Sequence, residues 1–339
     1  MKAALIGPDG RPLHEARRPT GGSGAPTDGA PGPGGAPGTE RADAALAGVL
    51  DFAADLVSIG LDRFGAPPLA AGVVVPGILS GDGDGDAGGT VRYAANLGWR
   101  DVPLGRLLGE RLAGIPVAVG HDVRAGGLAE GLLGAGRGAS RFLFVALGTG
   151  IAGAIGIDGR VEAGAHSGAG EIGHIVVRPD GPDCGCGQRG CLETLASASA
   201  VGRAWAAACG DPAADAADAA RAVTAGDPRA MRVWDGAVAA LADGLLTGIT
   251  LLDPEVVIVG GGLARAGDTL LDPLRAALRE RITFQHPPAL VPAELGDAAG
   301  CLGAGLLARA RVTTDRPVHG PTPPGTGVPA GSRLSLINI

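Results

Sequence analysis

One histidine and three cysteines stand close together between residues 174 and 191, and their side chains are of the types that bind zinc. They are His174, Cys184, Cys186 and Cys191, which offer one imidazole nitrogen and three thiolate sulfurs. Four protein ligands of this kind make a closed tetrahedral site, whereas a catalytic zinc keeps one position open for substrate. Glycines between the cysteines allow the backbone to fold tightly enough for the sulfurs to converge. We therefore predict a structural Zn²⁺ site, with a chance cluster of reduced cysteines as the alternative.

Two glycine-rich turns follow apolar, strand-like runs and are candidates for close approach to phosphate groups. Gly148-Thr149-Gly150 joins the runs RFLFVAL and IAGAIGI, and Gly260-Gly261-Gly262 joins VVIV to a helical segment. By itself the first turn is a weak signal, because Gly-Thr-Gly is common in hairpins. The second turn is no dinucleotide fingerprint, because the pattern G-x-G-x-x-G would need glycine where Arg265 stands.

Strands and helices must position these groups, and the apolar pattern predicts them in alternation. Pro8-Asp9-Gly10 is a turn signal between two strand-like runs, so residues 2–18 are expected to form a hairpin. Further strands are predicted at 70–79, 116–120, 141–147, 151–157 and 256–259, and helices at 42–59, 103–112, 123–133 and over much of 196–251. This alternation implies an α/β fold with layered sheets. Residues 19–39 and the segment from Thr313 are rich in Gly and Pro, and we expect a flexible loop and a disordered tail.

The composition argues against several classes of protein. With 339 residues, 45% of them hydrophobic, the chain can bury a sizeable core in one large or two ordinary domains. The net charge of -7 and the absence of a basic run argue against a nucleic-acid partner. No uninterrupted apolar run approaches the roughly 20 residues that span a bilayer, and the N-terminus turns polar too early for a signal peptide. We expect a soluble, cytoplasmic protein without a membrane partner.

The stretch GEIGHIVVRPDGPDCGCGQRGCLE, residues 170–193, closely resembles the signature of the ROK family of bacterial sugar kinases and repressors. NLGWRDVPL, VGHDVRAGGLAEG and VVIVGGGLARAG match further segments of that family in the expected order, and the resemblance covers residues 1–312. It implies a two-lobed, actin-like ATPase (ribonuclease H-like) fold in which sugar and ATP meet in a cleft. We expect a smaller α/β lobe over 1–118, a larger α/β lobe with the zinc site over 119–300, a helix returning to the smaller lobe over 301–312, and a disordered tail over 313–339.

The resemblance also assigns roles to single residues. It makes Asp122 the catalytic base, which accepts the proton of a sugar hydroxyl as that oxygen attacks the γ-phosphate of ATP. It assigns sugar contacts to Asn96, His121, Glu171, His174 and Glu193, and phosphate contacts to Gly148, Thr149, Gly150, Gly260, Gly261 and Gly262. The implied cofactors are ATP with Mg²⁺ and a structural Zn²⁺. Position alone leaves alternatives open, because Asp122 could be a helix N-cap and Glu193 a helix-start acid favoured by the macrodipole.

The chain departs from the family pattern at two places. The catalytic segment usually has Asn-Asp-x-Asn, and here it is His121-Asp122-Val123-Arg124, so the sugar contacts and the sugar itself stay open. A phosphate loop of the form D-x-G-G-T usually precedes the segment that KAALIGPDGRPL resembles, and we expect it to lie before Met1 in a longer chain. Residues 86–90 spell the same motif within a Gly/Asp-rich stretch, which we interpret as a surface loop.

Three functions compete on these grounds. The first is an ATP-dependent, glucokinase-like hexose kinase that acts at the sugar 6-hydroxyl, with glucose, N-acetylglucosamine and N-acetylmannosamine as candidate substrates. The second is a non-catalytic sugar-binding or regulatory relative that lacks the first phosphate loop. The third is a repressor, which in this family carries an N-terminal helix-turn-helix that the sequence lacks. A homodimer or homotetramer is expected from the family.

Overall fold

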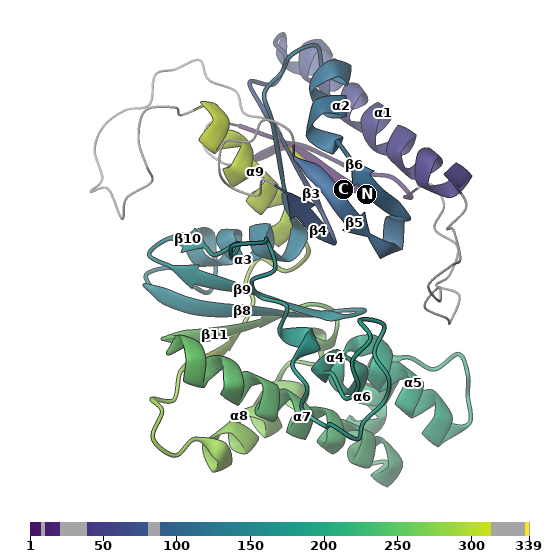
Figure 1. Ribbon diagram of the computed structural model, residues 1–339, viewed down its shortest axis with the longest axis vertical. Coiled ribbons are helices and arrows are strands. Elements are labelled where there is room, and N and C mark those ends of the chain that lie inside the picture. The colour runs from purple at the N-terminus through teal and green to yellow at the C-terminus, as the bar shows by residue number, and fades with distance from the viewer. Residues whose placement is uncertain (8–10, 21–38, 81–88, 313–335, 339) are drawn as a thin grey trace. The chain divides into compact units, whose positions relative to one another are not determined.

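The computed structural model describes residues 1–7, 11–20, 39–80, 89–312 and 336–338 (Figure 1). The turn expected at Pro8–Gly10, most of the loop at 19–39, residues 86–88 and most of the tail lie outside these ranges. The chain forms two compact units: unit 1 contains Met1–Ala129, Ala163–Gly168 and Ala298–Ile339, and unit 2 contains Glu130–Glu162 and Ala169–Asp297.

The first boundary between the units lies inside a helix, between Ala129 and Glu130. It was expected between residues 118 and 119, which is 11 residues earlier. The strand β7 (Val117–His121) pairs in parallel with β3 (Ala71–Val75), so it belongs to unit 1. The helix α3 (Asp122–Leu133) then crosses the boundary, because its last turn packs on unit 2: a Cβ on Gly131 would lie 2.4 Å from the Phe142 ring. The helix expected at 301–312 is α9 (Ala299–Val312), and it belongs to unit 1.

The described residues of unit 1 form three small sheets. In the first, β1 (Lys2–Ile6) pairs antiparallel with β2 (Pro12–Arg17), as the expected hairpin requires, and on its other edge with β13 (Leu336–Asn338). Three residues of the tail that we expected to be disordered therefore form a strand. The pair β3–β7 is the second sheet, and β4 (Ile78–Ser80), β5 (Thr90–Ala94) and β6 (Trp99–Val102) make the third.

The helices α1 (Thr39–Phe64) and α2 (Leu104–Arg111) pack on these sheets. The core of unit 1 includes Phe52 and Leu56 of α1 together with Val73 and Trp99 of the strands. Trp99 is 1% exposed, and its Nε1–H donates to the carbonyl of Ala42 at 3.1 Å. A buried indole finds a polar partner in this way, which fixes α1 against the third sheet.

Unit 2 is built on a five-stranded sheet in the order β10-β9-β8-β11-β12. The predicted strands β8 (Arg141–Leu147) and β9 (Ile151–Ile157) pair as a hairpin, and β10 (Arg160–Val161) extends it. The strand β11 (Val256–Gly260) runs parallel to β8 and to β12 (Ala289–Pro292). The helices of unit 2 are α4 (Leu192–Ala196), α5 (Ala198–Cys209), α6 (Ala216–Thr224), α7 (Pro228–Leu252) and α8 (Asp268–Arg281).

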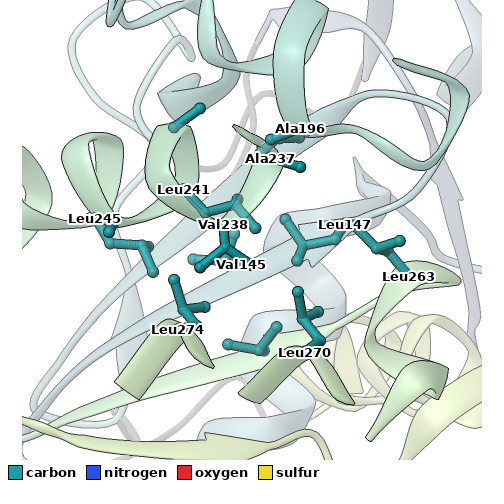
Figure 2. Packing of buried hydrophobic residues seen from close by; sticks show 14 of the residues in the cluster. Val145, Leu147, Ala196, Ala237, Val238, Leu241, Leu245, Leu263, Leu270 and Leu274 are labelled. Atoms are coloured by element: carbon teal, nitrogen blue, oxygen red, sulfur yellow. The ribbon is translucent and has the colours of Figure 1, made fainter. Parts of the chain in front are cut away.

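The core of unit 2 lies between this sheet and its helices. Figure 2 shows Val145 and Leu147 of β8 packed among Leu241 of α7 and Leu270 and Leu274 of α8. Side chains at the helix starts explain where α5, α6 and α7 begin. Their N-caps Ser197, Asp215 and Asp227 each accept a hydrogen bond from a backbone N–H of the first turn.

In the part of the chain that the structure describes, two helices are long and apolar enough to cross a membrane by length and composition: Glu40–Phe64 and Pro228–Leu252. The apolar window is 33% buried in the first helix and 50% buried in the second. Each helix contributes side chains to the core of its own unit, as Val49 and Leu56 do in α1. A core helix of a soluble protein passes the same length test, so these helices are weak evidence for a membrane segment.

Candidate functional site

The four predicted metal ligands converge in unit 2. Each residue offers one ligand atom, and these four atoms all lie within 4.8 Å of one another. They are a ring nitrogen of His174 and the Sγ atoms of Cys184, Cys186 and Cys191. The Sγ atoms of Cys186 and Cys191 are 3.7 Å apart, and Cys184 Sγ is 3.6 Å from His174 Nδ1. Four ligands at about 2.3 Å from a tetrahedral Zn²⁺ stand about 3.8 Å apart, so the cluster fits this ion. The sulfur separation is far above the roughly 2.05 Å of a disulfide.

Glycines allow the cysteine loop, residues 175–191, to close on itself. Gly190 has φ 69°, and a Cβ there would lie 1.4 Å from the carbonyl oxygen of Arg178. That close approach lets the N–H groups of Val177 and Arg178 donate to the Gly190 carbonyl at 3.0 and 3.1 Å. Cys184 N–H donates to the carbonyl of Gln188, which folds the tip of the loop back. Only glycine fits at position 190, because any side chain would collide with backbone.

The thiols of the cluster titrate differently from isolated cysteines. Burial raises the pKa of Cys184 to about 12, and burial also raises the pKa of Cys191. Burial pushes the pKa of Cys186 upward too, but hydrogen bonds from the Gln188 backbone and from the neighbouring thiols outweigh it and lower this pKa to about 7. Three thiolates this close repel one another, and a divalent cation among them would remove that repulsion.

Glu193 joins this cluster to the first glycine turn. Its Oε1 lies 3.6 Å from Cys184 Sγ and 3.8 Å from His174 Nδ1. Its Oε2 accepts a 3.4 Å hydrogen bond from the N–H of Ile151, and a Cβ on Gly150 would stand 2.7 Å from the same oxygen. One carboxylate thus contacts the predicted metal ligands on one side and the Gly148–Gly150 turn on the other.

The two glycine turns lie at the same edge of the sheet. The strands β8 and β11 are parallel neighbours, with Val145 opposite Val259 and Ala146 opposite Gly260, so the turns that follow them are adjacent. Gly261 has φ 88°, and a Cβ there would lie 2.5 Å from the carbonyl oxygen of Leu147. The absence of side chains brings the two backbones together beyond the carboxyl ends of parallel strands, which is where α/β proteins bind ligands.

Glu171 and His174 flank a single short turn. The 3-10 helix η2 (Ile172–His174) follows Glu171, whose carbonyl accepts from His174 N–H at 3.0 Å. Residues three apart on a 3-10 turn point the same way. Gly173 seats this turn against β9, because a Cβ there would lie 2.1 Å from the Ile151 carbonyl oxygen. Glu171, His174 and Glu193 therefore belong to one region of unit 2.

Asp122 and His121 lie in unit 1, where β7 runs into α3. His121 is 6% exposed, and its Nδ1 accepts from the N–H groups of Val123 at 3.2 Å and Arg124 at 3.4 Å. The imidazole thus caps α3, and in its neutral form it carries the proton on Nε2. The Asp122 side chain is 40% exposed, and its Oδ1 accepts from Val123 N–H at 2.7 Å. Asn96 is exposed in the same unit, on the 3-10 turn η1 (Ala95–Leu97).

Sequence reasoning did not predict that two charged side chains near these positions are buried. Arg124 is 5% exposed, and its guanidinium donates to the carbonyl of Ser167 at 3.0 Å, which ties the loop 163–168 to α3. This contact explains why that loop belongs to unit 1 although both its neighbours in sequence belong to unit 2. Glu130, in the last turn of α3, is fully buried. Both residues lie within the quoted catalytic segment, but no local pattern shows what their side chains contact.

Comparisons with known proteins agree with this architecture. The ROK family profile matches residues 47–311. The chain is 37% identical to a glucokinase of Thermotoga maritima over 240 residues, which are 66% of this chain and 75% of the relative. It is 35% identical to a glucokinase of Halalkalibacterium halodurans over 286 residues, 79% of this chain and 80% of the relative.

Solved structures extend the likeness to nearly the whole chain. A ROK hexokinase from Thermus thermophilus superposes with a TM-score of 0.73 at 33% identity, covering 93% of this chain and 100% of that one. A ROK glucokinase from Streptomyces griseus, solved with glucose and AMPPNP, gives 0.70 at 30% identity, covering 91% and 96%. These neighbours define an α/β, actin-like sugar kinase fold. The chain belongs to the ROK family, as the signature at 170–193 predicted, and it groups with the sugar kinases of that family.

Proposed function

We propose that this protein transfers the γ-phosphoryl group of ATP to the 6-hydroxyl of a hexose, with glucose as the preferred sugar. The observation that carries the proposal is the position of Glu193, whose carboxylate contacts His174 and the Gly148–Gly150 turn together. A carboxylate and an imidazole are hydrogen-bonding partners for sugar hydroxyls, and a glycine turn suits phosphate. Glucokinases among the relatives, and a neighbour solved with glucose and AMPPNP, support the same substrate pair.

Asp122 is the general base of the proposed reaction. Its carboxylate takes the proton of the sugar 6-hydroxyl while that oxygen forms a bond to the γ-phosphorus, and the bond from phosphorus to the bridging oxygen of ADP breaks. His121 Nδ1 shares the capping of α3 with Asp122 Oδ1, and the Asp122 side chain is 40% exposed to a substrate. Mg²⁺ bound with ATP would neutralise charge on the phosphates.

The zinc ligands support the sugar site indirectly in this proposal. His174, Cys184, Cys186 and Cys191 would hold the ion, which supplies a fixed positive charge and no open coordination position. With Nδ1 of His174 directed at the cluster, its Nε2–H is left to donate to an acceptor such as a sugar hydroxyl. Glu171, on the same turn, is a second candidate for a sugar hydroxyl.

The substrate is tested by measuring ADP release with ATP and each of glucose, N-acetylglucosamine and N-acetylmannosamine. We expect glucose to give the highest kcat/KM. The variant Asp122→Asn should lose turnover by about 100-fold or more while it still binds glucose, because the amide cannot accept the proton. Asp235→Asn, at an exposed position of α7, is the control and should behave as wild type. Undiminished turnover in Asp122→Asn would remove Asp122 as the base.

A non-catalytic, sugar-binding function is the second candidate. A ROK transcriptional regulator superposes on 79% of this chain with a TM-score of 0.68 at 27% identity, so the fold also serves regulation. Glucose binding without ADP release from wild-type protein would favour this function over the kinase. We further propose a homodimer or homotetramer, which light scattering of the purified chain would test.

A further inference from the structure

Glu130 carries a carboxylate that the proposed mechanism does not use. It is 0% exposed, and it is the only acidic residue among the buried ones that the structure describes. Its Oε2 accepts from Ala135 N–H at 3.0 Å and from Glu294 N–H at 3.2 Å, and its Oε1 accepts from Leu295 N–H at 2.8 Å. A buried charge is costly unless it is hydrogen-bonded, and three backbone donors suit the ionised form.

The three donors lie beside two places where the chain passes from one unit to the other. The first crossing is between Ala129 and Glu130, inside α3, and Ala135 stands in the turn that ends this helix. The second crossing is between Asp297 and Ala298, and Asp297 stands two residues after Leu295. On the side of unit 2, therefore, one carboxylate holds both crossings together.

The same two crossings are also fixed within unit 1. There α3 contacts α9 so closely that a Cβ on Gly303 would lie 2.1 Å from the Ala125 carbonyl oxygen. Arg124 holds the loop 163–168, which contains the two remaining crossings, through its hydrogen bond to Ser167. The helix that begins with Asp122 is thus anchored in unit 1 at its first turns and in unit 2 at its last.

The end of α3 is shaped around this carboxylate. A Cβ on Gly134 would lie 2.2 Å from Glu130 Oε2 and 3.0 Å from Leu295 Cγ, so alanine cannot fit there without moving the carboxylate. The backbone carbonyl of Glu130 accepts from the N–H groups of Gly134 at 3.1 Å and Gly136 at 2.9 Å. Both the side chain and the backbone of Glu130 therefore hold the turn that follows the helix.

We propose that Glu130 is a positioning residue for sugar phosphorylation. By fixing the last turn of α3 to the segment 294–295, it holds the far end of the helix that begins with Asp122. Asp122 must meet the sugar hydroxyl at a defined distance and angle, so a loose anchor would slow proton transfer without altering any group that touches substrate. This role rests on the proposed kinase function.

The test compares Glu130→Gln with Gly134→Ala in the full chain. Glutamine keeps the shape, but its NH₂ group cannot accept, so at least one of the three backbone N–H groups loses its partner. Gly134 has no left-handed φ, so alanine acts there through its Cβ, which displaces the carboxylate and leaves its charge in place. Gly236→Ala in α7 is the matched control, because nothing lies within 4 Å of the added Cβ.

Three readouts separate positioning from general damage. Amide hydrogen exchange at residues 135, 294 and 295 should become faster by about tenfold or more in both variants. Affinity for Mg²⁺·AMPPNP without sugar should stay at the wild-type value, because the hydrogen bonds of the Glu130 carboxylate go to residues 135, 294 and 295 and to neither glycine turn. The kcat per folded molecule, with saturating ATP and glucose, should fall about 10- to 100-fold. The control should match wild type in all three.

Several results would overturn the inference. Wild-type kcat in variants whose three amides exchange faster would show that the anchor is not needed for turnover. Unchanged exchange in both variants would show that the carboxylate does not hold these amides. An equal loss of kcat and of AMPPNP affinity would indicate damage to unit 2 as a whole. A wild-type chain that binds glucose without turnover would count against the proposed function, and the positioning role would fall with it.

Discussion

His121 and Asp122 both accept backbone N–H groups at the start of α3. The histidine Nδ1 accepts from Val123 and Arg124, and the aspartate beside it accepts from Val123 and stays 40% exposed. An amide side chain at position 121 would accept the same N–H groups, because Asn is among the best N-caps. This chain has His121 where the family pattern has Asn, and the replacement is therefore compatible with the local fold. It changes the hydrogen-bonding groups that position 121 can present to a sugar.

The cap can be tested with two substitutions of His121. His121→Ala removes the acceptor and should lower the free energy of unfolding by about 1 kcal/mol, whereas His121→Asn should retain most of it. Urea unfolding monitored by circular dichroism measures both. Equal losses in the two variants would mean that packing of the buried imidazole, and not its hydrogen bonds, stabilises this position.

The second glycine turn contains a matched pair of positions for separating fold from ligand binding. Gly261 has φ 88° and lies against the Leu147 backbone, so Gly261→Ala should destabilise unit 2 by several kcal/mol. Gly262 has open space around an added Cβ and an ordinary φ, so Gly262→Ala should leave the melting temperature unchanged. If the turn approaches a nucleotide, that variant should bind Mg²⁺·AMPPNP about tenfold more weakly. Wild-type affinity would place the nucleotide elsewhere.

At the scale of elements, an ion-pair network joins the segment that carries the predicted metal ligands to two helices. Arg178, in the loop, donates to Asp243 Oδ2 at 2.7 Å, and Arg281 at the end of α8 donates to Asp243 Oδ1 at 2.6 Å. One carboxylate of α7 therefore joins the loop to a second helix. Three elements that are distant in sequence depend on this single side chain, and no spacing along the chain indicates it.

Removing Asp243 should destabilise unit 2 in a pH-dependent manner. Burial pushes the pKa of Asp243 upward, but the hydrogen bonds from Arg281 and Arg178 outweigh it, so the pKa is lowered. A lowered pKa stabilises the fold above the unfolded value of about 3.9, and this contribution is lost as the pH falls through the folded value. Asp243→Ala should therefore cost about 1–3 kcal/mol at pH 7 and progressively less below about pH 4. Asp235→Ala in the same helix is the control, and a pH-independent difference would contradict the argument.

The metal site is tested by its stoichiometry and by one ligand. We expect about one Zn²⁺ per chain by atomic emission, and Cys186→Ser should lose most of it, because three ligands bind a structural zinc far more weakly than four. Cys209→Ser is the matched control, since Cys209 lies in α5 outside the cluster. A metal-free chain that is fully folded would contradict the assignment.

The sequence predicted some parts of the site and not others, for physical reasons. The convergence of His174, Cys184, Cys186 and Cys191 could be predicted because short spacing and glycines make it a local property, and the two strands within 141–157 could be predicted from their local apolar runs. The adjacency of the two glycine turns depends on β8 pairing with β11 more than 100 residues later (256 less 147 is 109), and the apolar pattern of a buried strand does not specify its neighbour. Glu130 and Arg124 were missed because their backbone partners lie 165 and 43 residues away.

At the scale of the whole molecule, each unit has its own hydrophobic core. The core of unit 2 contains Leu143, Leu241 and Leu274, and that of unit 1 contains Phe52, Val73 and Leu108. The glycine turns and the predicted metal ligands all belong to unit 2, so a nucleotide or metal bound there would stabilise the core of that unit. A ligand that binds only the folded form raises stability by RT ln(1 + [L]/Kd), about 2.7 kcal/mol at 100 times Kd.

We therefore expect the units to unfold separately and to respond differently to ligands. Of the three tryptophans, Trp99 is buried in unit 1, and Trp205 and Trp234 lie in unit 2, so fluorescence can report each unit. Trp99→Phe leaves the reporters of unit 2, and the double variant Trp205→Phe/Trp234→Phe leaves that of unit 1. Without sugar, Mg²⁺·AMPPNP should raise the midpoint seen by the unit 2 reporters, and chelation of zinc should lower it, while the Trp99 signal stays unchanged. Coincident shifts of both signals under each ligand would contradict this prediction and show that the two cores unfold together.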